Sequence, residues 1–242
     1  MRDMLKVEEI LIFSILPLLQ GIKHVAVGAS SPIPAAAAML MRRRSKGQVR
    51  VSILGNTQRY TFTDGGRELF DLAGQGRIDA FFLSGGQIDG EANVNLVGIG
   101  DYPQMSVRFP GSFGSAYLYY VVPRVILFRE EHTSRVFVDK VDFISAAGGS
   151  EPLVYRPGGP YALVTGRCVM KFNSAERSFV LASLHPGESI QSVKENTGFE
   201  FICPDNIPET PLPGIDLLNC LRGSVADQLA ATYPTFVERV FG

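Results

Sequence analysis

The residues best suited to chemistry lie in one glycine-rich stretch between positions 85 and 116. Amide and carboxyl side chains are interleaved there with two glycine turns. Glycines let backbone N–H groups approach an anion or a developing oxyanion, and ligands of open α/β sheets bind at the carboxyl ends of strands. We therefore expect substrate binding or oxyanion stabilisation here. The candidate residues are Gly85, Gly86, Gln87, Asp89, Asn93, Asn95, Gly111, Ser112 and Gly114.

The second of these turns, Gly111-Ser-Phe-Gly114, precedes a predicted helix over residues 116–121. Free N–H groups at a helix start carry partial positive charge, which suits a carbonyl oxygen that becomes negative. A glycine turn before a helix also occurs for purely structural reasons, and that alternative stays open.

The acidic and polar side chains of the stretch allow two interpretations. Asp89, Glu91 and Asp101 could position water, but loop aspartates more often cap backbone N–H groups. The three amide side chains could meet a substrate carbonyl or close turns. Arg108 could meet a carboxylate or phosphate, or form an inter-subunit salt bridge. Ser112 has no His–Asp spacing beside it that indicates a serine triad.

The cysteines and histidines give no indication of a metal site. The cysteines are odd in number, widely spaced and without a CxxC pair, which favours neither a disulfide framework nor zinc and fits a reducing cytoplasm. The histidines are too far apart in sequence to suggest a metal cluster. These residues are Cys168, Cys203, Cys220, His24, His132 and His185.

Charge and hydropathy exclude two classes of partner. With 23 Lys and Arg against 24 Asp and Glu, no global field attracts nucleic acid or an anionic membrane surface. The basic residues 42–44 and 46 are interpreted as a solvated helix end, with contact to a phosphate or a partner as the alternative. The apolar run Ile10–Leu19 is too short to span a bilayer and predicts a buried helix.

Strand and helix patterns alternate along the first half of the chain. This alternation predicts an open, mainly parallel α/β sheet with helices on both faces. Residues 1–242 are expected to form one domain, with a proline-rich arm near 203–214. Predicted strands cover 23–27, 49–54, 80–83, 124–128, 161–165, 168–172, 179–184 and 199–202, and predicted helices cover 32–41, 66–75, 116–121 and 225–240.

A series of short motifs, over roughly residues 80–210, resembles the β subunits of glutaconate-type (class I) coenzyme A transferases. The motifs follow one another in the family's order, which is far more specific than a single glycine pattern. They are Gly85–Asp89, Asn93–Asn95, Gly100-Asp101, Arg108–Ser112, Val141–Ile144, Gly158–Pro160, Leu163–Thr165, Lys171-Phe172, Ser183–Gly187 and Glu195–Glu200.

The resemblance implies a partner and a reaction. It implies an α-type subunit of the same fold in a heterodimer or heterotetramer, with the active site between the two chains. It also implies CoA transfer between carboxylic acids, with no cofactor beyond the CoA of the substrate. His185, in the Ser-Leu-His-Pro-Gly motif, is interpreted as part of a structural turn.

One departure from the family pattern bears on the reaction. The family's nucleophilic glutamate stands at the end of the second strand, and aligning the turn glycine with Gly55 places Ile53 there. Isoleucine cannot form a covalent intermediate. Three hypotheses follow: transfer with a carboxylate from the partner, hydrolysis of an acyl-CoA or of a ring carbon–carbon bond as in steroid-degrading relatives, or a non-catalytic subunit.

Overall fold

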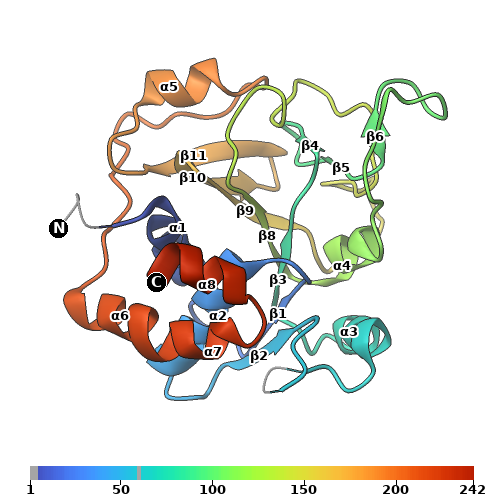
Figure 1. Cartoon of the computed structure of the whole chain (residues 1–242). Helices are drawn as coiled ribbons and strands as arrows, with labels where there is room; N and C mark the ends of the chain where they lie inside the picture. The colour runs from blue at the N-terminus through green and yellow to red at the C-terminus, as the bar shows by residue number, and fades with distance from the viewer. Residues whose placement is uncertain (1–4, 59–60) are drawn as a thin grey trace. The chain divides into compact units, whose positions relative to one another are not determined.

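The computed structural model describes residues 5–58 and 61–242. The chain divides into two compact units, the first formed by Met1–Phe82 with Pro211–Gly242 and the second by Leu83–Thr210. Each unit contains strands with helices connected to them (Figure 1).

The first unit is built on three parallel strands. Strand β1 pairs in parallel with β2 on one side and β3 on the other, so β2 is the last strand in this order. The elements are α1 (Val7–Ile15), the 3-10 turn η2 (Leu16–Leu19), β1 (His24–Val27), α2 (Pro32–Arg44), β2 (Arg50–Ile53), α3 (Gly65–Gly74), β3 (Ala80–Leu83), α6 (Ile215–Cys220), the π-helical segment η3 (Leu221–Val225), α7 (Ala226–Ala230) and α8 (Pro234–Phe241).

The sequence explains why α2 begins and ends where it does. Pro32 opens its first turn, where the missing N–H is not needed. Alanines 35–38 are fully buried and allow close packing. Cations fill the last turn, and Lys46 and Gly47 then take positive φ angles of 53° and 85°, which end the helix and return the chain to β2.

The predicted buried helix at the N-terminus is confirmed as α1 followed by η2, with Pro17 at the start of the 3-10 turn. Glu9 of α1 is 1% exposed and forms an ion pair with Arg222, at 2.6 Å to Nε and 2.8 Å to Nη2. The same carboxylate accepts a hydrogen bond from the Lys6 backbone N–H at 2.9 Å. Two segments far apart in the sequence are thus joined within the first unit.

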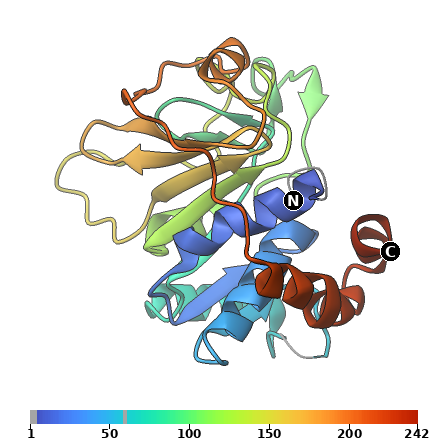
Figure 2. The same cartoon turned by 90° about the vertical axis from the view of Figure 1, so that its left-hand side faces the viewer.

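The second unit combines one parallel pair with antiparallel strands. Strand β8 pairs in parallel with β9, and β9, β10 and β11 continue antiparallel side by side (Figure 1 and Figure 2). The elements are β4 (Gln87–Ile88), β5 (Val94–Asn95), β6 (Gly98–Ile99), β7 (Val107–Arg108), α4 (Ser115–Val121), β8 (Arg124–Arg129), β9 (Pro160–Thr165), β10 (Cys168–Asn173), β11 (Ser178–Leu184) and α5 (Ile190–Glu195).

The predicted fold class, an open and mainly parallel α/β sheet, is confirmed by these strands and helices. Two predicted elements are wrong. Residues 199–202 form no strand, because only Ile202 makes a bridge, to Val180. The predicted helix 225–240 is two helices, since Pro234 lacks an N–H and forces Tyr233 out of the helical region, to φ −131° and ψ 60°.

Candidate functional site

The carboxyl end of β2 contains no reactive side chain. Ile53 is 0% exposed and pairs with Val27 of β1, and the Leu54 N–H extends the ladder by donating to the Val27 carbonyl at 2.9 Å. Gly55 then turns the chain at a φ of 85°. The side chain at position 53 is therefore part of the core of the first unit, and a carboxylate there would be removed from water.

Sequence reasoning gave no role to Asn56, which follows that glycine. It is 7% exposed, donates from Nδ2 to the Thr232 hydroxyl at 2.8 Å and accepts from the Gln58 N–H at 3.0 Å. Its partner Thr232 is 176 residues away in sequence, so the local pattern held no signal for this contact. Asn56 orders the turn after β2.

Asp89 holds a turn of the second unit. Its side chain is 3% exposed, and Oδ1 accepts the backbone N–H groups of Glu91 at 3.1 Å and Asn93 at 2.9 Å. Oδ2 accepts the Asn93 side-chain amide at 3.1 Å and lies 3.5 Å from the Val141 N–H. These contacts give Asp89 the capping role that is common for loop aspartates.

Asn95 is fully buried and saturated with hydrogen bonds. Its Nδ2 donates to Gln87 Oε1 at 2.7 Å and to the Gly98 carbonyl at 2.6 Å, and its Oδ1 accepts the N–H groups of Val97 at 2.9 Å and Gly98 at 3.2 Å. All the donor and acceptor positions of its amide are thus used within the protein. Asn95 positions the β5–β6 corner.

Gln87 differs from its neighbours in having a donor left over. Its Oε1 accepts from Asn95 and from the Asp142 N–H at 3.0 Å, but Nε2 has no hydrogen-bond partner among the described residues. Asn93, by contrast, uses Nδ2 on Asp89 and Oδ1 on the Gly148 N–H at 3.0 Å. The structure thus brings four predicted polar residues together, and the amide N–H groups of Gln87 are the ones left unused among them.

The predicted glycines fall into two kinds. A Cβ on Gly85 would lie 2.5 Å from a Val94 methyl group, and one on Gly86 would lie 2.2 Å from the Phe109 ring, so both glycines are required by close packing. Gly111 is exposed and has a φ of 103°, and a Cβ added to it would meet no atom within 4 Å. Of these three glycines, Gly111 alone has open space around it.

That open turn leads into the seven-residue helix α4. Gly114 is the N-cap, and the Ser112 carbonyl accepts the Ser115 N–H at 2.8 Å. Phe113, between them, has a positive φ of 47° and is 77% exposed. The turn presents Ser112 beside an exposed aromatic ring.

The remaining charged candidates lie on the surface. Arg108 is exposed and stacks over the Tyr102 ring, with the guanidinium carbon 5.7 Å from the ring centroid. Glu91 forms an exposed ion pair with Arg177 at 3.1 Å, and Asp101 is exposed. None of these three is held in a buried constellation with the polar cluster of Gln87, Asp89, Asn93 and Asn95.

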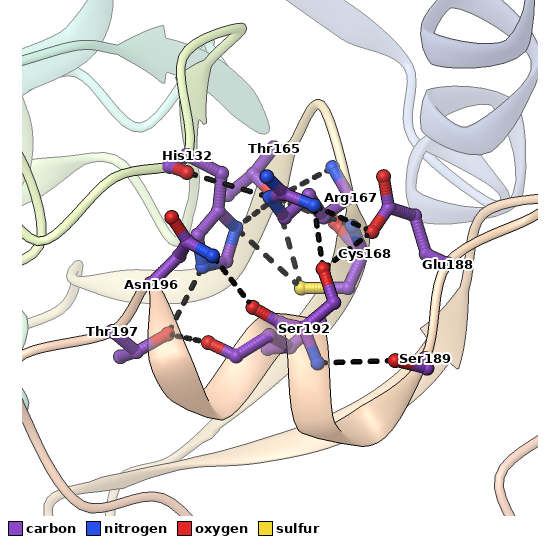
Figure 3. A network of polar contacts seen from close by, with 10 residues as sticks. His132, Thr165, Arg167, Cys168, Glu188, Ser189, Ser192, Asn196 and Thr197 are labelled. Carbon is purple, nitrogen blue, oxygen red and sulfur yellow. Dashed lines mark hydrogen bonds and ion pairs between the residues drawn. The ribbon is translucent and has the colours of Figure 1, made fainter.

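A second polar network surrounds His132 (Figure 3). Its Nδ1 lies 2.7 Å from the Thr165 hydroxyl and its Nε2 lies 2.9 Å from the Thr197 hydroxyl. Burial, reinforced by the Arg167 charge, lowers the pKa of His132 to about 4. The imidazole is neutral at pH 7 and both its nitrogens are occupied, so it is a structural group.

The other buried titratable groups of this network are equally constrained. Burial raises the pKa of the Cys168 thiol to about 12, which rules out a thiolate nucleophile at neutral pH. His185 lies 2.9 Å from the Thr210 hydroxyl and 2.8 Å from the Thr165 carbonyl, and burial lowers its pKa. These contacts support the interpretation of the His185 motif as a structural turn.

Within residues 5–58 and 61–242, no group of three or more His, Cys, Asp or Glu side chains is arranged to hold a metal ion. Over the same residues, no helix has the length and apolar character needed to cross a membrane.

Sequence comparison shows several relatives, three of which illustrate their range. The chain is 37% identical over 163 residues to the B subunit of 3-oxoadipate CoA-transferase from Pseudomonas knackmussii, covering 64% of this chain and 62% of the relative. It is 34% identical to the B subunit of glutaconate CoA-transferase from Acidaminococcus fermentans, covering 49% and 47%. It is 32% identical to the cholesterol ring-cleaving hydrolase IpdB subunit of Rhodococcus jostii, covering 55% and 54%. The matches therefore span about half to three fifths of these relatives.

Solved structures share the fold. Rhodococcus jostii IpdAB matches with a TM-score of 0.82 at 22% identity, covering 99% of both chains. Glutaconate coenzyme A-transferase of Acidaminococcus fermentans matches with a TM-score of 0.77 at 22% identity, covering 90% of this chain and 94% of that one. The decarboxylase AibA/AibB matches with a TM-score of 0.74 at 21% identity, covering 98% and 99%. The match to the coenzyme A transferase family extends over residues 9–196, and the chain belongs to that family.

Proposed function

We propose that this chain is the β-type subunit of a heteromeric enzyme that acts on acyl-CoA thioesters and transfers CoA between carboxylic acids. The observation that carries the proposal is the coenzyme A transferase match over residues 9–196. The partner is an α-type subunit, in a heterodimer or heterotetramer, and no cofactor is needed beyond the CoA of the substrate.

Two features of the second unit support a role in binding the thioester. Gln87 has a free amide donor, and the Gly111–Gly114 turn is open to solvent. An amide donor such as that of Gln87 can stabilise a carbonyl oxygen as it becomes negative during acyl transfer, and the open turn leaves room for a ligand. The buried residues Asp89, Asn93 and Asn95 act indirectly, because they hold the backbone on which Gln87 is placed.

The buried Ile53 favours a second candidate, hydrolysis of an acyl-CoA or of a ring carbon–carbon bond in a CoA thioester. Transfer through a glutamyl thioester requires a carboxylate at the reacting carbon. Residues 50–58 contain no Asp or Glu, and Ile53 is 0% exposed. In either reaction the catalytic carboxylate must come from elsewhere, and the α-type subunit is its proposed source. A third candidate is a non-catalytic subunit that only shapes the site or stabilises its α-type partner.

Product analysis separates these candidates. The chain is produced together with an α-type subunit and supplied with a panel of acyl-CoAs, with and without acetate or succinate as the acceptor. The masses of the products are measured by mass spectrometry. A new CoA ester that forms only with the acceptor supports transfer. Acceptor-independent addition of one water supports hydrolysis, and retention of CoA on the product identifies cleavage of a carbon–carbon bond. If no acyl-CoA changes under any condition, the proposal is wrong.

A further inference from the structure

The first unit contains an open cavity of about 650 Å³ whose wall is strongly basic. Four cationic side chains line it, and no Asp or Glu is among the lining residues. This volume is within the range of about 300–1,000 Å³ that is usual for small-molecule sites. The lining residues, here called the basic groove, are Arg42, Arg43, Lys46, Gly47, Arg50, Val51, Ser52, Thr61 and Gln228.

The turn between α2 and β2 forms one wall of the basic groove. Arg42 donates from Nη1 to the carbonyls of Gly47 at 3.2 Å and Val49 at 2.9 Å. Ser45 accepts the Val49 N–H at 3.1 Å. These bonds fix the path from the helix end to Arg50, the first residue of β2. The wall is thus held in place by Arg42 without any ligand.

The charges of the basic groove are left largely uncompensated. Arg43 and Lys46 are exposed and have no ion pair among the described residues. Arg50 approaches Glu68 at 3.8 Å, but that carboxylate also caps the start of α3 by accepting the N–H groups of Thr63 and Asp64. A partly exposed pair at the long distance of 3.8 Å adds little stability.

The helix dipole explains only part of this arrangement. Cations in the last turn of α2 interact favourably with its negative end. Lys46 lies beyond the helix and Arg50 belongs to the strand, so neither is placed there by the dipole. Like charges gathered in one cavity repel one another, and a multiply charged anion would convert that repulsion into attraction. Arginine side chains are the groups best suited to bind phosphate through two hydrogen bonds.

We propose that the basic groove binds a ligand with two or more phosphate groups, either the nucleotide end of a CoA thioester or a separate nucleotide. The first source rests on the proposed function; the phosphate chemistry does not.

Calorimetric titration of the full chain with pyrophosphate tests the proposal. Arg43→Ala and Lys46→Ala should each weaken binding by about tenfold, the usual effect of losing one charge-assisted contact. Arg44→Ala is the matched control, because Arg44 lies in the same helical turn and is exposed but does not line the groove. It should change the affinity less than about twofold, within the range of screened surface charges.

Parallel titrations with CoA and with 3′,5′-ADP identify the source of the phosphates. If Arg43→Ala weakens CoA binding as much as pyrophosphate binding, the ligand is CoA. If CoA binds unchanged while pyrophosphate and the nucleotide are weakened, the groove serves another phosphate ester. Equal weakening by Arg43→Ala and Arg44→Ala, or no binding of pyrophosphate by the intact chain, overturns the proposal. None of these measurements depends on turnover, so a failed activity assay would refute the proposed function and leave this result standing.

Discussion

Replacing Ile53 by glutamate tests whether the position that aligns with the family nucleophile can reach substrate. Ile53 is 0% exposed, so the substitution removes the burial of one large aliphatic side chain, worth about 1.5–3 kcal/mol. It also buries a carboxyl group, which takes up a proton there. Protonating a group of pKa about 4.3 at pH 7 costs about 4 kcal/mol, at about 1.4 kcal/mol per pKa unit. The free energy of unfolding should therefore fall by about 5–7 kcal/mol at pH 7.

Urea unfolding at pH 5 and pH 8 measures this loss. Desolvation raises the pKa of a buried carboxyl group, so the folded state keeps a proton that the unfolded state releases above pH 4.3, and the loss grows as pH rises. Ile53→Val, which costs about 1 kcal/mol, controls for packing. Leu54→Glu, at a partly exposed position, controls for the added charge. A loss below about 1 kcal/mol without pH dependence would refute the buried placement and would show that a carboxylate at 53 can face solvent.

Three further changes test the described contacts. The pKa of His132 is about 4 in the folded state, so the unfolded state binds more protons and the free energy of unfolding should rise by about 3 kcal/mol between pH 4 and 6.5. His132→Gln should reduce this rise, measured by urea unfolding at several pH values. An unchanged rise in the variant contradicts a lowered pKa for His132. Gly86→Ala should destabilise by about 1–3 kcal/mol, and Phe109→Leu in the same chain should restore part of it, whereas no recovery would refute the proposed clash. Glu9→Ala should lower the melting temperature through a loss of about 2–3 kcal/mol, since Arg222 loses its carboxylate; a shift within error contradicts a stabilising pair.

Much of the fold could be predicted from the sequence because its signals are local. The proline at the start of α2 and the four alanines after it specify a buried helix, and apolar runs specify β1 and β3. The apolar pattern of the final helix predicts one continuous helix, although Pro234 is the residue at which a new helix begins. The bridge at Ile202 depends on pairing with β11, which no local pattern reveals.

The sequence predicts which residues form the candidate site, but it does not predict which of them support the backbone and which keep a donor free. Four polar side chains of the 85–116 stretch gather, those of Gln87, Asp89, Asn93 and Asn95, whereas its other charged candidates lie on the surface. Within the cluster, Asp89 contacts Val141 and Asn93 contacts Gly148, both more than 50 residues away. Because their polar groups bond to these distant backbone groups, Asp89 and Asn93 support the backbone instead of facing a ligand. Gln87 keeps a free donor because both of its contacts use its side-chain oxygen. The basic residues 42–44 and 46 have the sequence pattern of an ordinary helix end, and no local signal predicts that Arg50 shares a cavity with three of them.

The proposed subunit role is tested most directly by measuring acyl-CoA consumption with each chain alone and with both together. The chain is purified with and without its α-type partner, and loss of the thioester is followed spectrophotometrically at matched concentrations. Turnover by the complex, at a rate far above the sum of the two separate chains, is the predicted result. Equal turnover by either chain alone, or a stable complex that leaves every acyl-CoA unchanged, would contradict a β-type subunit acting on CoA thioesters.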